Sequence, residues 1–189
     1  MSSYFGWPND GSDPSGGGDN SGNPGYAFVY NFATAYTCPG SGDQNIDVIQ
    51  TWMKKVSTGA GYVRLAIYTV ASPGLLVCQG NAKVGVTNAT YAWLGHSAFS
   101  GTTVLSGGST YRISCVSEST DTCNYERAAA AGTEHYEGAT TYYDDGFPAN
   151  DSAATGTRAY EKSMRCGVTA AGGVPRARYK KYYDYRRAQ

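Results

Sequence analysis

Alternation of apolar and polar residues dominates the middle of the chain, and a helical period is almost absent. In residues 62–69, Val63, Leu65 and Ile67 alternate with more polar neighbours, which is the pattern of a strand with one buried face. The same pattern predicts further strands at 26–36, 46–56, 75–79, 82–87, 90–95, 102–105, 110–117 and 157–168.

Three of these segments predict which side chains face the core. The expected inward faces are Ile46, Val48, Trp52 and Val56 in 46–56, Tyr111, Ile113 and Cys115 in 110–117, and Tyr160, Met164, Cys166 and Val168 in 157–168. One segment differs, because the alanine-rich residues 127–131 predict about one turn of helix, which Gly132 would end.

Turn signals such as Pro73-Gly74 and Gly107-Gly108 separate the predicted strands. Eight or more short strands with turns every eight to twelve residues are typical of two packed antiparallel sheets. We therefore expect an all-β fold, an antiparallel β-sandwich of jelly-roll-like form with extended N- and C-terminal arms.

Composition agrees with this class. Charged residues are only 16% of the chain, while Gly occurs 25 times and Tyr 17 times. A coiled coil would need charged and apolar residues in heptads, and no run approaches the ~18 apolar residues of a membrane span. The first residues have no basic start and no apolar core, so we expect no secretory signal.

Two terminal segments flank the predicted sandwich of residues 26–172. The first, 1–25, is rich in Gly, Pro and Asn, which is the composition of an arm with little means of forming a core. Asp10, Asp13 and Asp19 suggest a calcium loop, but they lack its regular spacing, so an arm is the preferred interpretation.

The second terminal segment, residues 173–189, is basic and rich in tyrosine. Six of the 15 basic residues and one of the 15 acidic residues lie here, so this tail carries a net charge of +5 and the rest of the chain −5. The residues expected to make contacts are Arg176, Arg178, Tyr179, Lys180, Lys181, Tyr182, Tyr183, Tyr185, Arg186 and Arg187. Three interpretations remain open: a subunit-docking arm, a solubilising tail, or a segment that contacts nucleic acid through phosphates and stacked bases.

Candidate catalytic chemistry is sparse. Five cysteines with no short paired spacing predict reduced thiols rather than a disulfide framework or a zinc site. Residues 134–137 (Glu-His-Tyr-Glu) are the densest titratable cluster, where a histidine beside a glutamate could act as a base, although solvated loop charges are the commoner case. His96 follows an aromatic strand and is expected to be structural. We expect no enzyme activity, no cofactor and no metal.

A set of motifs carries a resemblance to known modules. They are Val63-Arg64-Leu65-Ala66-Ile67-Tyr68, then Ser72-Pro73-Gly74-Leu75, and later Leu105-Ser106-Gly107-Gly108-Ser109-Thr110-Tyr111. Over residues 26–168 the chain resembles small jelly-roll or β-sandwich modules found in the fibre and head-decoration proteins of tailed phages and beside bacterial carbohydrate-active domains. The resemblance implies a non-catalytic protein and covers neither terminal arm.

These observations lead to two expectations about function. The first is a non-enzymatic virion structural protein, a phage head-decoration or fibre component made in the host cytoplasm, which binds other copies of itself or other virion proteins. The alternative is a carbohydrate-binding or adhesin module that recognises a host glycan. Its expected site is Tyr142, Tyr143, Asp144 and Asp145, because sugar sites combine exposed aromatic rings with acid or amide side chains, although tyrosine is also enriched at subunit interfaces.

Overall fold

The computed structural model describes residues 2–7, 14, 19–20, 30–55, 61–71, 74–117, 123–137, 146–150 and 156–172, with the backbone alone for strand residues 7, 19–20, 30–34, 117, 123–137 and 156–162. Fourteen strands and no helix occur in these residues. The strands are β1 (Ser3–Trp7), β2 (Asp19–Asn20), β3 (Tyr30–Thr37), β4 (Asp43–Lys55), β5 (Gly61–Thr69), β6 (Leu76–Gly80), β7 (Val84–Val86), β8 (Ala92–His96), β9 (Phe99–Gly101), β10 (Val104–Ser106), β11 (Thr110–Ser117), β12 (Cys123–Glu137), β13 (Gly156–Lys162) and β14 (Met164–Ala170).

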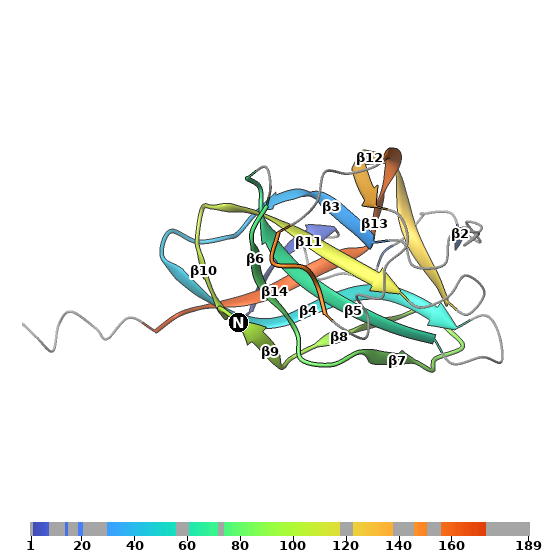
Figure 1. Cartoon of the computed structure of the whole chain (residues 1–189), viewed down its shortest axis with the longest axis horizontal. Helices are drawn as coiled ribbons and strands as arrows, with labels where there is room; N and C mark the ends of the chain where they lie inside the picture. The colour runs from blue at the N-terminus through green and yellow to red at the C-terminus, as the bar shows by residue number, and fades with distance from the viewer. Residues whose placement is uncertain are drawn as a thin grey trace, which may run out of the picture.

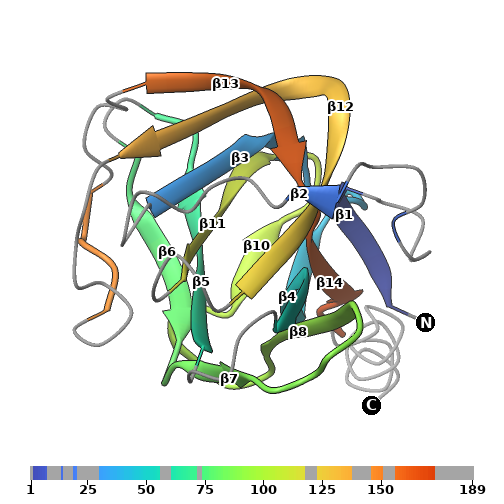
Figure 2. The same ribbon diagram turned by 90° about the vertical axis from the view of Figure 1, so that its right-hand side faces the viewer.

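Two antiparallel sheets form a sandwich, which confirms the predicted all-β class (Figures 1 and 2). The first sheet has the order β1-β14-β4, and both β8 and β10 pair with the other edge of β4. The second sheet has the order β3-β11-β5-β6-β9, with β7 also paired to β5.

Strand β12 joins the two sheets. Its first residues pair with the end of β4, and its last residues pair with β3 (Figure 2). Between them it pairs with β13, and the register shifts between Ala129 and Glu134, which brackets Gly132. The predicted helical turn at 127–131 is therefore wrong. A single helical turn is too short to be stable by itself, and pairing with β13 overrides the preference of alanine for helix.

The main core lies between the sheets. Val63, Leu65 and Ile67 of β5 are completely buried, and Ile113 and Cys115 of β11 pack beside them, as the alternation predicted. Met164, Cys166 and Val168 supply the inward face of β14. The side chain of Tyr160 lies outside the described residues, as does Val56. The predicted strand 157–168 is in fact two strands, which are separated at the buried Ser163.

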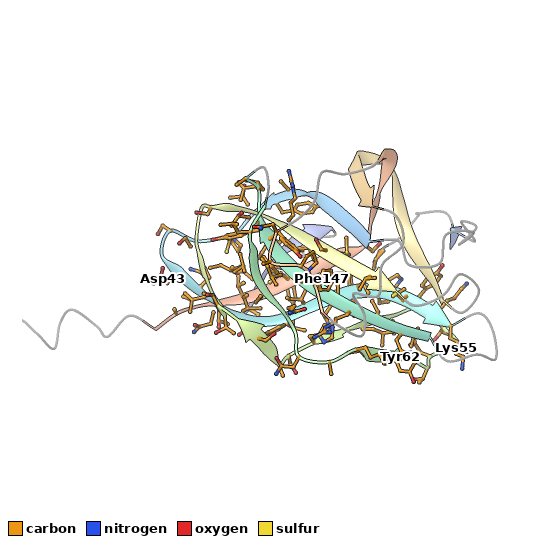
Figure 3. The ribbon with its side chains drawn as sticks, in the orientation of Figure 1. Asp43, Lys55, Tyr62 and Phe147 are labelled. Carbon is orange, nitrogen blue, oxygen red and sulfur yellow. The ribbon has the colours of Figure 1, made fainter. Side chains whose placement is uncertain are left out.

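A smaller cluster covers the opposite face of β5. Tyr68 and Phe147 pack edge to face with ring centroids 6.3 Å apart, and the Tyr68 hydroxyl donates a hydrogen bond to the Pro148 carbonyl at 2.7 Å. Phe147 lies in the middle of the molecule in Figure 3. Strand β5 is consequently buried on both faces, which a simple alternation of apolar and polar residues does not predict.

The sandwich also includes a strand from the segment expected to be an N-terminal arm. β1 pairs with β14 from Ser3↔Val168 to Trp7↔Met164, and only 3% of Phe5 is exposed. The Phe5 ring lies 6.5 Å from the ring of Tyr111 in the other sheet. Residues 3–7 thus contribute to the core, although the composition of 1–25 gives no sign of it.

Candidate functional site

A β-bulge in β4 decides which residues cover the outside of the first sheet. Val168 pairs with Ile46 and Gly167 with Val48, so Asp47 is an extra residue in β4. Because an extra residue moves the following side chains to the other face, the inward positions change from Ile46 to Ile49, Thr51 and Met53. The prediction that Val48 and Trp52 face inward is therefore wrong, because both lie on the outward side of β4 after the bulge.

The outward residues of four neighbouring strands gather on one surface, which we call the aromatic–cationic face. It contains Tyr4 of β1, Arg165 of β14, Gln50, Trp52 and Lys54 of β4, Trp93 of β8, and Tyr91 just before β8. Arg165 is buried with 7% exposed, and the other six side chains are partly exposed. The Tyr4 ring packs directly over Gly167, and a side chain at that position would interfere, because its Cβ would lie 2.9 Å from the ring.

The Arg165 side chain lies between two rings of this face. The Arg165 guanidinium lies 3.7 Å from the ring centre of Trp93 and 4.5 Å from that of Tyr4, and its Nε donates to Gln50 Oε1 at 3.1 Å. Such contacts contribute about 0.5–2 kcal/mol each, depending on how far they are desolvated. They hold a buried cation between two strands and fix the orientation of both rings.

The row continues along β8. Trp93 contacts Trp52 with centroids 5.3 Å apart and planes tilted by 59°. Trp52 lies nearly parallel to Tyr91, with 6° between the planes and 6.4 Å between the centroids. Lys54 Nζ lies 4.4 Å from the Tyr91 ring centre. The result is a surface of large, mutually packed rings with two positive charges.

A second feature is an open groove of about 730 Å³ at the start of β4. Its walls come from Ser3, from the turn at residues 39–42 with Asp43 and Gln44, and from the end of β14 up to Gly172. Asp43 is exposed, and farther along β4 the Asp47 carboxylate accepts hydrogen bonds from Ser2 Oγ at 2.9 Å and Thr169 Oγ1 at 3.0 Å. Gly172 is also the last described residue before the basic tail.

His96 is a structural residue within the core. It is 6% exposed, and its Nε2 accepts a hydrogen bond from the Leu65 backbone N–H at 3.2 Å. Leu65 lies between the parts of β5 that pair with β7 and β6, so the imidazole supplies the acceptor that neither strand offers there. Burial, and secondarily the positive charge of Arg64, lowers the pKa of His96 to about 4. The neutral form is therefore the one present at neutral pH.

Four buried cysteines, Cys38, Cys78, Cys115 and Cys166, form no disulfide. Burial raises the pKa of Cys78 to about 12 and raises that of Cys166 well above its usual value, with smaller contributions at Cys166 from Cys78, Cys38 and Asp47. Because the thiolate is the nucleophilic form, these thiols are suited to packing rather than to chemistry. Across the described residues, no cluster of three or more His, Cys, Asp or Glu could hold a metal ion.

Several residues singled out from the sequence lie outside the described part of the chain. They are the candidate glycan site, Tyr142, Tyr143, Asp144 and Asp145, and the whole tail from Arg176 to Arg187. The cluster at 134–137 lies on β12, where His135 pairs with Phe32 and Thr157, but its side chains are not described.

The aromatic–cationic face was missed from the sequence, although part of its signal was present. Arg165 stands between Met164 and Cys166, two correctly predicted inward residues, so it must face outward. Tyr91, just before β8, and Trp93 and Gly95 within it similarly share one side. The bulge at Asp47, which brings Trp52 to the same side, has no comparable signal.

Comparison of the chain with protein-family models, curated proteins and solved structures gives no match. In the described part of the chain, no helix has the length and apolar character needed to cross a membrane.

Proposed function

We propose that this protein is a non-enzymatic structural component of a virus particle, a head-decoration or fibre protein of a tailed phage, which contacts other particle proteins through its aromatic–cationic face. The observation that carries the proposal is the row of Tyr4, Arg165, Trp93, Trp52 and Tyr91 on one face of the first sheet. The β-sandwich class and the resemblance to phage modules over residues 26–168 support the viral setting.

The residue types and their rigidity fit a protein partner. Trp, Tyr and Arg are the side chains most enriched among residues that dominate binding energy at protein interfaces. Rings already fixed by Arg165 and by each other lose little conformational freedom on binding, which lowers the entropic cost of association. Among the residues that the structure describes, the strongly shifted pKa values belong to His96 and to thiols buried in the core, which accords with a structural role.

Substitution on this face tests the proposal. Trp52→Ser should reduce binding of the purified protein to particles obtained from the culture that expresses it, measured by co-sedimentation. An interface residue of this kind contributes about 2 kcal/mol or more, so the dissociation constant should rise roughly 30-fold.

The matched control is Tyr62→Ser, which also removes a ring that contacts a cation, Lys83 Nζ at 4.4 Å, but on β5 near the Lys55 end of the sandwich (Figure 3). It should leave particle binding unchanged. Thermal unfolding of both variants checks that they are folded. Undiminished particle binding by a folded Trp52→Ser variant would show that the aromatic–cationic face does not make this contact.

A second candidate function is carbohydrate binding at the same face. The observation that favours it is the nearly parallel pair of Trp52 and Tyr91, with the Gln50 amide and the Lys54 amine beside them. Sugar rings pack against aromatic rings while amides and amines bind their hydroxyl or acidic groups. Retention of the wild-type protein, but not of Trp52→Ser, on a glycan array would support this function, and no retention would reject it.

A further inference from the structure

The groove at the start of β4 has room for a chain with large side chains. Most of its lining residues are small, among them Ser3, Gly40, Gly42, Ala170 and Gly172. A Cβ added at Gly42 or Gly172 would meet no atom within 4 Å, so open space adjoins the backbone on both sides of the groove. Neither glycine has a positive φ, so their lack of a side chain is not required by the backbone.

The walls of the groove are held firmly. The Ala171 backbone N–H donates to the Asp43 carbonyl at 2.8 Å, and the Gly107 N–H donates to the Gly42 carbonyl at 2.9 Å. The Gln44 side-chain amide also donates to the Gly42 carbonyl at 3.0 Å. A ligand would therefore meet a formed surface rather than one it must first order.

The charge of the groove selects the kind of ligand. Asp43 is the one charged residue among those that line it, and it is exposed. Asp47 does not line the groove, but its carboxylate accepts a hydrogen bond from Thr169, which stands between the lining residues Val168 and Ala170. A basic segment with bulky side chains matches this combination of small wall residues and negative charge.

The chain itself contains such a segment. Residues 173–189 combine six basic residues with Tyr179, Tyr182, Tyr183 and Tyr185, and the segment begins directly after Gly172. At about 3.3 Å per residue, these 17 residues reach as far as roughly 55 Å from the groove.

The sequence at the start of the tail favours binding to the groove of a second copy over binding to the groove of its own chain. To enter its own groove, the tail would have to reverse direction within the few residues after Gly172. The sequence disfavours such a reversal, because a proline disfavours the helical conformation at the residue before it, here Val174, and limits its own φ. A tail from a second copy needs no reversal of this kind to reach the groove.

We propose that this groove binds the C-terminal tail, residues 173–189, of a second copy of the chain. Because every copy has both a groove and a tail that starts beside it, two copies can exchange tails around a two-fold axis. The proposal extends the proposed function by naming a partner and a second contact surface, and it rests on that function only for the setting in which copies meet.

Cross-linking of the full chain tests the contact directly. A photoreactive phenylalanine analogue replaces Tyr182, and this protein is mixed with an equal amount of isotopically heavy full chain before irradiation. We expect cross-linked peptides that contain residues 39–44 or 168–172, with light tails joined to heavy bodies. Cross-links only within one copy, or only to other surfaces, would overturn the proposal.

Two substitutions test the groove in the full chain by sedimentation velocity over a range of concentrations. Gly42→Phe fills the open space, and Asp43→Lys reverses the charge. Each should raise the concentration needed for half-association at least 10-fold. Gly85→Phe is the matched control. Gly85 lies on β7, away from the groove, and a Cβ there would meet no atom closer than 3.9 Å. Equal association of all three variants with wild type would overturn the proposal.

The two proposals fail in different ways. Absence of the chain from virus particles would contradict the proposed function, whereas tail-to-groove cross-links between copies would still stand. Conversely, a particle protein whose tail cross-links elsewhere would retain the function and lose this contact.

Discussion

At the residue scale, His96 couples the stability of the fold to pH. Its pKa falls from 6.5 to about 4 on folding, because burial and Arg64 both disfavour the charged form. Between these values the unfolded chain binds more protons than the folded chain, so the free energy of unfolding falls as the pH falls. The contribution is complete above pH 6.5, and about 2 kcal/mol of it should be lost by pH 5.

Thermal unfolding from pH 7 to pH 5 measures this effect, with an expected fall of several degrees in Tm. His96→Gln keeps an acceptor for the Leu65 N–H but removes the titration, so its Tm should vary less over this range. Identical pH dependence in wild type and His96→Gln would contradict the role assigned to His96.

Thiol reactivity is a second property set by single residues. Cys38, Cys78, Cys115 and Cys166 are buried, and burial raises the pKa of Cys78 and Cys166. Titration of the native protein with a thiol reagent at pH 8 should therefore leave four of the five thiols unmodified, and denaturant should expose all five. Rapid modification of two or more thiols in the native state would show that the core is more open than described.

At the scale of elements, β1 is the strand whose contribution is least expected from its composition. Phe5→Ala should lower the free energy of unfolding by about 3–5 kcal/mol, because it leaves a cavity between the two sheets beside Tyr111. Ser3→Ala, at an exposed position of the same strand, should change it by about 0.5 kcal/mol or less. Denaturant unfolding monitored by fluorescence compares the two, and equal stabilities would show that β1 does not belong to the core.

The strands that could be predicted from the sequence are those whose alternation is uninterrupted. The inward faces of β5 and β11 follow directly from Leu65, Ile67 and Ile113, and the structure confirms them. The sequence predicts where strand β4 lies, but not which of its side chains face the core beyond Asp47. The bulge at Asp47 depends on pairing with β14. Local alternation carries no information about such a long-range partner.

Dependence on distant strands also explains why the structure of β12 and the make-up of the candidate site could not be predicted from the sequence. Residues 127–131 resemble helix locally, yet pairing with β13 decides their structure. The aromatic–cationic face joins residues from β1, β4, β8 and β14, which are separated by up to 161 positions between Tyr4 and Arg165. Its members could be recognised singly as outward residues, but their association depends on the order of strands in the sheet.

At the scale of the whole molecule, the two surfaces that we propose as contact sites lie apart on the sandwich. The aromatic–cationic face covers one side of the first sheet, and the groove beside Asp43 lies at one end of β4, opposite Lys55 (Figure 3). A protein with two such surfaces can bind a scaffold with one and a further copy of itself with the other. This arrangement suits a repeated component of a large assembly.

The most direct test of the viral role is mass spectrometry of particles purified on a density gradient from the culture that expresses the chain. We expect peptides from residues 26–172 to peak in the same fractions as the particles, at a copy number comparable to that of other structural proteins. Recovery of the chain only in the soluble fractions, with none in the particle peak, would contradict the proposed function.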